Sequence, residues 1–301
     1  MQAQLLGFVH VNRDSNGCFA INPDGSCIVA KFKRRWVGTS DNNALIRDVG
    51  DVTSISASDD CRVICVTRRE NTSFIAVDGY MQRMRACYKA CVSPNGQYCI
   101  LNDPDGLFLY AVYPRYKTQI FHMQHADYYA YTFTPDSKRF IAGRVPSLFD
   151  VESHHELLKF DAPTVHLARV TPNGKHVVFA GIEALYICSM DTGKLKAKIV
   201  VPGAILSLAV SNTYAVTSDR SSAIVWSFFT CKQMYRIVRP GIMEVKVTAD
   251  GTKILICGEL RTIYMFEVRD FVYSMVSFVK ASGMEKFDGD FAMGTRLFGT
   301  I

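Results

Sequence analysis

The side chains that could bind a metal or carry catalysis are few and widely spaced in this 301-residue chain. Two histidine clusters occur, His122-x-x-His125 and the adjacent pair His154-His155. Neutral imidazole is a common metal ligand. However, residues three apart on a strand point to opposite faces of the sheet, so we do not expect His122 and His125 to share a metal ion. We interpret these histidines as surface or structural residues.

Acidic residues are scattered and fall mostly in expected turns. Asp127 and Glu244 are the only carboxylates near the expected starts of inner strands, and we interpret both as loop residues that cap turns. The chain contains no nucleophile elbow, phosphate-binding loop, dinucleotide fingerprint or zinc-binding helix. The sequence therefore predicts a protein that is not an enzyme and that needs no metal or other cofactor.

Ten cysteines invite a metal or disulfide interpretation, but their spacing argues against it. Cys61 and Cys65, and likewise Cys87 and Cys91, are four residues apart within expected strands. Such residues share a face but lie roughly 13 Å apart, too far to share one zinc ion. We interpret the cysteines as reduced, buried thiols, which are typical of an intracellular, reducing compartment such as the cytoplasm.

Two short runs mix basic with aromatic residues and are the candidate partner-binding sites. The first comprises Lys31, Lys33, Arg34, Arg35 and Trp36, and the second comprises Tyr113, Arg115, Tyr116 and Lys117. Arginine, tyrosine and tryptophan are enriched in the residues that dominate protein interfaces. The plainer alternative is that one or both runs are solvated loops. The net charge of +6 is too small for this length to argue for nucleic acid, although such side chains can stack on single-stranded RNA bases.

The elements that must position these residues are indicated by seven turn motifs. They are Pro23-Asp24-Gly25, Ser58-Asp59-Asp60, Pro94-Asn95-Gly96, Pro135-Asp136-Ser137, Pro172-Asn173-Gly174, Ser211-Asn212-Thr213 and Ala249-Asp250-Gly251. Their first residues are 35, 36, 41, 37, 39 and 38 apart, and each motif lies between two short apolar runs. A period of about 35–45 residues with tight hairpin turns is typical of propeller blades. We predict an all-β fold, a seven-bladed β-propeller of four-stranded antiparallel blades.

The strand pattern is clearest in the fifth repeat, where strands are expected over 165–171, 175–180, 184–190 and 195–200. The third and fourth strands of the first repeat cannot be delimited between residues 35 and 49. We expect residues 4–11 to take part in closing the ring, with 271–279 as the competing segment. This gives one propeller domain over 1–279 and a C-terminal extension over 280–301. No apolar stretch is long enough to cross a bilayer, and we expect no secretory signal and no membrane partner.

Several of these residues carry a resemblance to a known family. The Pro-Asp-Gly and Pro-Asn-Gly turns of repeats one, three and five, the stretch Tyr186 to Lys194, and Ile224-Val225-Trp226-Ser227 resemble the WD-repeat family of β-propellers over about residues 17–279. The Gly-His that opens a family repeat is absent. The Trp-Asp that ends the third strand is nowhere intact, Trp226-Ser227 and Phe149-Asp150 being nearest. The family's buried His–Asp network is therefore expected to be missing, and packing must hold the blades.

The resemblance implies a non-catalytic scaffold, a rigid platform that binds other proteins or peptides within a larger assembly. Two alternatives remain open: a propeller enzyme of the lactonase or hydrolase type with a site in the central channel, and an RNA-binding component of a ribonucleoprotein. The Lys31–Trp36 run follows the second strand of repeat one, whereas the Tyr113–Lys117 run precedes the fourth strand of repeat three. We expect the two runs to open on opposite faces.

Overall fold

The structure is a computed structural model, and it describes eleven segments of the chain. These segments are 3–10, 18–26, 28–33, 36–38, 44–47, 52–68, 72–112, 117–124, 130–239, 241–258 and 262–268. They contain seven four-stranded sheets, and every neighbouring pair of strands within them is antiparallel. The prediction of an all-β propeller with four-stranded antiparallel blades is confirmed.

The strands follow one another along the chain from the inside of each sheet to its outside. The first sheets comprise β2 (Phe19–Ile21), β3 (Ile28–Lys33), β4 (Trp36–Gly38) and β5 (Ala44–Arg47); β6 (Val52–Ala57), β7 (Val63–Arg68), β8 (Ser73–Val77) and β9 (Tyr80–Met84); and β10 (Lys89–Val92), β11 (Tyr98–Asp103), β12 (Gly106–Val112) and β13 (Lys117–Gln124).

The remaining sheets repeat this plan. They comprise β14 (Thr132–Phe133), β15 (Arg139–Ala142), β16 (Ser147–Asp150) and β17 (Glu156–Lys159); β18 (Leu167–Val170), β19 (His176–Ala180), β20 (Ala184–Ser189) and β21 (Leu195–Val200); β22 (Ser207–Val210), β23 (Tyr214–Ser218), β24 (Ser222–Ser227) and β25 (Gln233–Val238); and β26 (Ile242–Val247), β27 (Lys253–Gly258), β28 (Thr262–Val268) and β1 (Ala3–His10).

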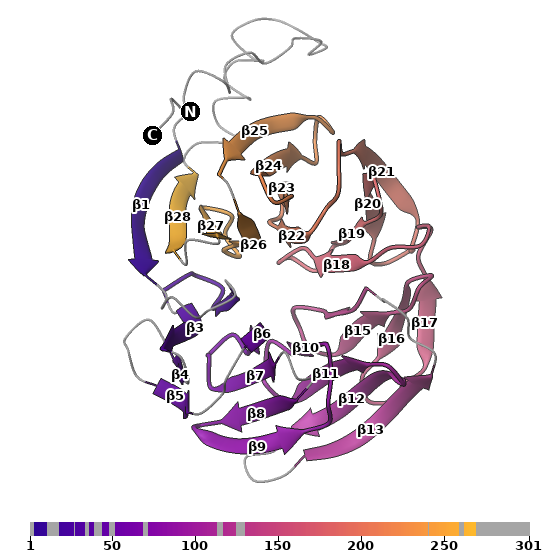
Figure 1. The fold of residues 1–301 in the computed structure, drawn as a ribbon. Helices are drawn as coiled ribbons and strands as arrows, with labels where there is room; N and C mark the ends of the chain where they lie inside the picture. The colour runs from indigo at the N-terminus through magenta and orange to yellow at the C-terminus, as the bar shows by residue number, and fades with distance from the viewer. Residues whose placement is uncertain are drawn as a thin grey trace, which may run out of the picture.

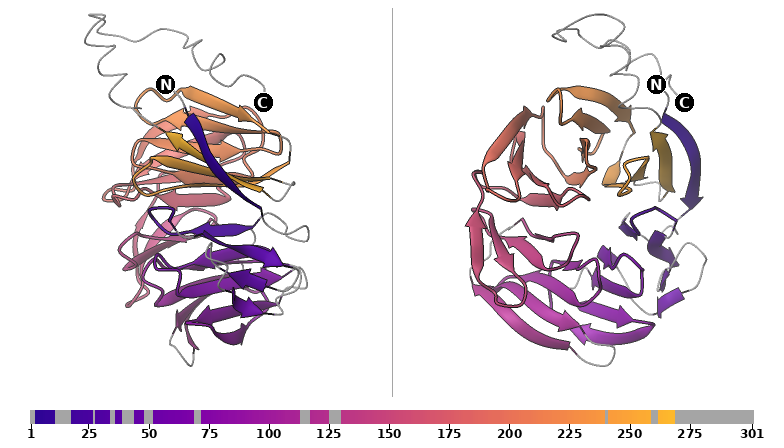
Figure 2. Two further views of the ribbon diagram at one scale, coloured as in Figure 1. Left: turned by 90° about the vertical axis from the view of Figure 1, so that its left-hand side faces the viewer. Right: turned by 180° about the vertical axis from the view of Figure 1, so that it is seen from behind.

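The sheets are arranged around a common centre, with β6, β10, β18, β22 and β26 innermost and β9, β13, β17, β21 and β25 at the rim (Figure 1). Figure 2 shows the same ring edge-on and from behind. Apolar side chains fill the space between neighbouring sheets. Every residue of β12 is buried, whereas the outer strand β21 alternates mostly exposed residues with the buried Ile199. This difference follows from position in the sheet, because strands such as β12 that lie between two others are covered on both faces by neighbouring sheets, whereas rim strands meet water.

The N-terminal strand completes the last sheet. β1 pairs with β28 in antiparallel register from Ala3 opposite Val268 to His10 opposite Thr262. The preference for residues 4–11 in ring closure is confirmed. The competing segment 271–279 and the expected extension 280–301 lie outside the described residues. Because β1 is far in sequence from β28, this pairing ties the two ends of the described chain together.

In most sheets, a buried residue with a hydroxyl side chain lies at the start of the turn between the first and second strands. In the fifth repeat, Thr171 Oγ1 donates to Asn173 Oδ1 (2.7 Å) and accepts the backbone N–H of His176 (3.1 Å). The same pair of hydrogen bonds occurs at Ser58, Ser93, Thr134 and Thr248. All five hydroxyl residues are almost fully buried. Packing is therefore not alone in holding the blades, since this network satisfies backbone groups at each turn.

The turns also join neighbouring sheets. Asn173 N–H donates to Asn212 Oδ1 at 2.9 Å, and the hydroxyl of Tyr214 donates to the carbonyl of Gly251 at 2.8 Å. Gly96 has a φ of 73°, and a Cβ at this position would lie 2.8 Å from Val63 Cγ2 in the preceding sheet. The predicted Asn-Gly turn thus needs glycine both for its backbone conformation and for its close contact with the preceding sheet.

Candidate functional site

A cavity of about 870 Å³ lies at the centre of the ring. All seven inner strands contribute to its wall. One lining residue from each inner strand, in chain order, is Ile21, Ser54, Lys89, Thr132, Arg169, Ala209 and Lys246. Because successive residues of a strand point to opposite sides, only alternate positions of each inner strand project strongly toward this space. The cavity is therefore the place where residues from distant repeats meet.

Three cationic side chains line this cavity, each from a different sheet. Lys89 lies four residues before the buried turn hydroxyl of its repeat, while Arg169 and Lys246 lie two residues before theirs. Even spacing places all three on the same side of their strands. The position of Lys89, two residues nearer the start of its strand than those of Arg169 and Lys246, is displaced from theirs by about 7 Å along the strand direction. The sequence analysis missed this cluster, because the three cations are 80 and 77 residues apart along the chain.

Only one of the three cations has a carboxylate partner among the described residues. Lys246 Nζ lies 2.7 Å from Glu244 Oε1, and both side chains are 22% exposed. Arg169 Nη1 donates to the carbonyl of Ala168 at 2.8 Å. Lys89 forms no ion pair and no side-chain hydrogen bond within the part of the chain that the structure describes. The positive charges of Lys89 and Arg169 are thus uncompensated by a direct anionic contact.

The electrostatics of the cavity reflect this arrangement. Although Lys89 keeps contact with solvent, restricted hydration between the cavity walls lowers its pKa, and the positive charge of Arg169 lowers it further. Glu244 acts in the opposite direction and Lys246 adds to the lowering. Burial raises the pKa of the Cys91 thiol, with Arg169 opposing it. A thiol with a raised pKa is a poor nucleophile at neutral pH.

The structure corrects the interpretation of Glu244 as a loop residue that caps a turn. Glu244 lies within the inner strand β26, and its Oε2 accepts the backbone N–H of Phe19 in β2 at 3.2 Å. It therefore connects the last sheet to the first while it pairs with Lys246. The sequence could not reveal this role, because the partner Phe19 is 225 residues away along the chain. Asp127, interpreted in the same way, lies outside the described residues.

Several large side chains are exposed where the chain enters the inner strands. Tyr88, His166 and Leu206 occupy equivalent positions, each five residues before the turn hydroxyl. The backbone N–H of each donates to a carbonyl near the end of the second strand of its sheet, that of Asn102, Ala180 or Ser218 (2.8, 3.0 and 2.8 Å). Tyr88 is 54% exposed and Leu206 49% exposed. Met243, one residue before Glu244, is 44% exposed. These residues could have been found from the sequence, because each lies five residues before the turn hydroxyl of its repeat.

We call this side of the ring the mouth face and the other side the turn face. In an antiparallel sheet, the connection into the first strand and the connection between the second and third strands open on the same side. The mouth face therefore also carries Val145 and Ile182, which lie in second-to-third connections and are 58% and 82% exposed. The turn face carries the first turns and the third-to-fourth connections, including Phe229, which is 91% exposed.

The structure describes the backbone of only part of the two candidate partner-binding runs. Lys31 and Lys33 lie in β3 and pair with Val37 and Trp36 of β4, and this end of β3 opens on the mouth face. Lys117 begins β13 opposite Val112, and this end of β13 opens on the turn face. The members of these runs outside the described residues are Arg34, Arg35, Tyr113, Arg115 and Tyr116.

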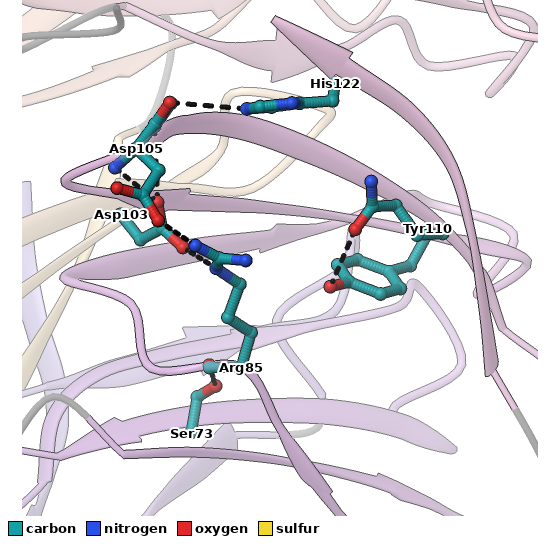
Figure 3. Close-up of polar contacts among 8 residues, drawn as sticks. Ser73, Arg85, Asp103, Asp105, Tyr110 and His122 are labelled. Carbon is teal, nitrogen blue, oxygen red and sulfur yellow. Dashed lines mark hydrogen bonds and ion pairs between the residues drawn. The ribbon is translucent and has the colours of Figure 1, made fainter. Parts of the chain in front are cut away.

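A second polar cluster, at the boundary between two sheets, is structural. Arg85 follows β9 and forms ion pairs with Asp103, the last residue of β11, and with Asp105 in the turn after it (Figure 3). The guanidinium lies 4.3 Å from the ring centre of Phe108, which stacks on His122 at 4.1 Å. Asp103 is 2% exposed and Arg85 41% exposed. This cluster fastens the second sheet to the third, and it gives His122 the structural role expected from the sequence.

The side chains that could hold a metal do not gather within the described segments. No group of three or more histidine, cysteine, aspartate or glutamate residues there has an arrangement suited to a metal ion. The nine cysteines in these segments are free thiols. The described segments also contain no helix with the length and apolar character needed to cross a membrane.

Comparison with known proteins bears on the fold. No family model matches the chain, and no curated protein sequence matches it. Among many matching solved structures is the β-propeller domain of Cps50 (Swd1) from Myceliophteria thermophila, with 14% sequence identity and a TM-score of 0.69. The match covers 88% of this chain and 99% of that domain. At this identity the likeness shows the fold alone, and the predicted resemblance to WD-repeat propellers is confirmed at that level.

Proposed function

We propose that this chain is a non-catalytic scaffold whose mouth face binds a partner protein within a larger assembly. The observation that carries the proposal is the set of exposed apolar side chains at equivalent positions around the cavity mouth. Tyr88, Leu206 and Met243 are each 44 to 54% exposed on rigid inner-strand ends. Large apolar and aromatic side chains held on a rigid frame bury much area on binding at little entropic cost.

We also propose that the seven sheets are the seven blades of one closed ring that extends over residues 1–279, with 280–301 as an extension. The central cavity supports this count, because inner strands of all seven sheets line it. Closure by β1 supports it as well. An experimental structure with six or eight blades would contradict the count, and loss of folding on deletion of 280–301 would contradict the boundary.

Several features favour a scaffold over a propeller enzyme. Glu244 is engaged by Lys246 and by the backbone of Phe19, and Asp103, which also lines the cavity, is paired with Arg85. Cys91 has a raised pKa. A propeller hydrolase needs an available base or nucleophile that faces substrate. In the described cavity wall, Glu244 and Asp103 are held in ion pairs and the thiolate of Cys91 is disfavoured, which leaves Asp59, at the turn end of the cavity, as the remaining carboxylate.

A protein partner also fits the mouth face better than RNA does. Tyr88, Leu206, Met243, Val145 and Ile182 give this face an apolar character, whereas RNA binding relies on a dense array of cations with stacking aromatic rings. Lys31 and Lys33, in β3, add basic residues at one point of the mouth face. That combination, an apolar centre with a charged edge, is typical of protein interfaces.

Affinity capture with matched variants tests the proposal. The double variant Leu206→Asp with Met243→Asp places charge on the mouth face, and Phe229→Asp does the same on the turn face. All three side chains are substantially exposed, so stability should change by only about 0.5 kcal/mol. We expect quantitative mass spectrometry to show that the mouth-face variant loses its protein partners and that Phe229→Asp keeps them. Equal partner recovery by both variants would overturn the proposal.

The candidate runs are tested by charge reversal in the same assay. Reversal of Arg34 with Arg35 alters the mouth face, and reversal of Arg115 with Lys117 alters the turn face. We expect the first pair to weaken partner capture and the second to leave it unchanged. If capture is lost only on reversal of Arg115 with Lys117, the partner binds the turn face instead. Strong RNA recovery that falls steeply with salt would favour the ribonucleoprotein alternative.

A further inference from the structure

We propose that the central cavity binds a compact polyanion, a small molecule that carries two or more phosphate groups. This inference goes beyond the proposed scaffold role and depends on different residues. The cations Lys89, Arg169 and Lys246 enter the cavity from three non-neighbouring sheets. Lysine and arginine contribute several charge-assisted donors each, and phosphate oxygens are their preferred small acceptors. Cations placed in this way can contact a ligand from several sides.

The charge count favours an anion. Glu244 matches Lys246 through their ion pair, which leaves Lys89 and Arg169 in excess. Two further carboxylates line the cavity. Asp103 is compensated by Arg85. Asp59 follows the turn hydroxyl Ser58, so it lies about three residues, or roughly 10 Å, farther along its strand direction than the level of Arg169 and Lys246. The mouth half of the cavity is therefore net positive.

This excess charge is unfavourable without a ligand. Like charges in a confined space repel one another and lose hydration, and the lowering of the Lys89 pKa by Arg169 and Lys246 is consistent with that repulsion. Folding alone gives no reason to gather cations from β10, β18 and β26 around one space. A bound polyanion converts the repulsion into attraction, because each cation then faces phosphate oxygens.

The size of the cavity limits the ligand. A volume of about 870 Å³ lies within the range of roughly 300–1,000 Å³ usual for small-molecule sites. It holds several phosphate groups but neither a folded domain nor a nucleic-acid duplex. The His166 ring at the mouth bonds the carbonyl of Ile205 at 2.8 Å, so it closes part of the rim and does not enter the charge count.

Calorimetric titration of the whole chain tests the site. The probes are orthophosphate, pyrophosphate and tripolyphosphate, which share one chemistry and differ in charge. We expect affinity to rise along this series and to weaken at high ionic strength, because Coulombic attraction is screened by salt. Absence of tripolyphosphate binding at low salt, or equal affinity for all three probes, would overturn the proposal. A tighter complex with an oligoglutamate peptide would instead identify an acidic peptide as the ligand.

Matched variants locate the binding. Lys89→Met with Arg169→Met removes the two unmatched cations, and we expect the affinity for tripolyphosphate to fall roughly tenfold or more. Lys196→Met with Lys198→Met removes the same charge from the exposed outer strand β21 and should leave affinity unchanged. Equal losses in the two double variants would show diffuse attraction and overturn the proposal.

A further variant tests the site in the opposite direction, by a gain of affinity that a folding defect cannot produce. Glu244→Gln frees Lys246 from its carboxylate and should strengthen binding. A Glu244→Gln protein with unchanged or weaker affinity would contradict the placement of the anion beside Lys246. Partner capture by the mouth face is measured separately, so failure here leaves the scaffold proposal intact.

Discussion

Glu244 and Lys246 lie on the same side of the inner strand β26, with 2.7 Å between Oε1 and Nζ. The other carboxylate oxygen of Glu244 accepts the backbone N–H of Phe19 in β2 at 3.2 Å. The Glu244 side chain thus neutralises one cation of the central cavity and also links the last sheet to the first. This contact adds to the link between these two sheets that the chain itself makes, since β1 of the last sheet leads on to β2 of the first.

Replacement of Glu244 by alanine should lower the free energy of unfolding by about 1–3 kcal/mol, because Lys246 and the Phe19 N–H both lose a charged partner. Glu244→Gln should cost less, since its amide oxygen still accepts the Phe19 N–H. Glu183→Ala serves as control, because Glu183 is exposed in the connection between β19 and β20. Urea unfolding gives the comparison. A Glu244→Ala midpoint equal to that of the control would contradict this role.

The Arg85 cluster predicts a strong difference between two ion pairs of similar geometry. Arg85 pairs with the buried Asp103, whereas Arg62 pairs with Asp78 at 2.7 Å on the surface, with side chains 65% and 42% exposed. Arg85→Met leaves a buried carboxylate without its cation and exposes the face of Phe108. We expect a loss of about 2 kcal/mol, allowing for the partial exposure of Arg85.

Arg62→Met should have no measurable effect on unfolding, because water and salt screen an exposed pair. Arg85→Lys should recover only part of the loss, since an ammonium group cannot bind two carboxylates with the planar geometry of a guanidinium. Thermal and urea unfolding of the three variants check this order. The explanation fails if Arg62→Met and Arg85→Met unfold at the same urea concentration.

Most of the fold could be predicted from the sequence, because propeller blades are built from local contacts. Turn motifs and apolar runs lie within one repeat, and their chemistry specifies hairpins directly. The first repeat was the exception. Its outer strands β4 (Trp36–Gly38) and β5 (Ala44–Arg47) are only three and four residues long. Strands this short carry too few residues for an alternating pattern to stand out.

The central cavity could not be predicted in the same way. Lys89, Arg169 and Lys246 meet only because the ring brings three distant repeats together, and each looks like an ordinary polar residue within its own repeat. Glu244 was misread for the same reason, since its partner Phe19 is 225 residues away. The repeat alignment itself contains the missing signal. Residues four and two positions before the turn hydroxyl line the cavity in successive inner strands. Charged residues that will face the cavity can therefore be identified from the sequence once the repeats are aligned.

The buried turn hydroxyl predicts a stability effect that sequence analysis did not anticipate. Thr171→Val preserves shape but removes the group that bonds Asn173 and the backbone N–H of His176. Leaving these buried groups unsatisfied should cost about 1–3 kcal/mol. Thr171→Ser retains the hydroxyl and should cost clearly less, as serine occupies the equivalent position 93.

Thr164→Val provides the matched control for the same substitution at an exposed site, where the change should stay within about 0.5 kcal/mol. Urea unfolding followed by tryptophan fluorescence measures all three variants. If Thr171→Val and Thr164→Val were equally stable, the repeated hydroxyl would be a by-product of turn sequence rather than a stabilising contact.

The acidic residues of the turns predict a loss of stability in acid. Burial raises the pKa of Asp250, but hydrogen bonds from the Thr248 hydroxyl and the Thr252 N–H outweigh this, so its pKa is lowered from 3.8. The same balance lowers the pKa of Asp136 and Asp219. A carboxylate with a lowered folded-state pKa contributes stability that is fully present above the unfolded value, near pH 3.8, and is lost as the pH falls through the folded value.

We therefore expect the urea concentration at the unfolding midpoint to decrease once the pH is lowered below about 4. This decrease should be smaller in the variant Asp250→Asn than in the parent. An amide fits this turn, since Asn95 and Asn173 accept the same hydroxyl hydrogen bond in their repeats. Asp59 acts in the opposite direction, because burial and the neighbouring Asp60 raise its pKa, and it moderates the loss. Measuring the midpoint at intervals from neutral pH to pH 2 separates the variants. If the acid dependence of Asp250→Asn matches that of the parent, Asp250 does not contribute to the pH dependence of folding.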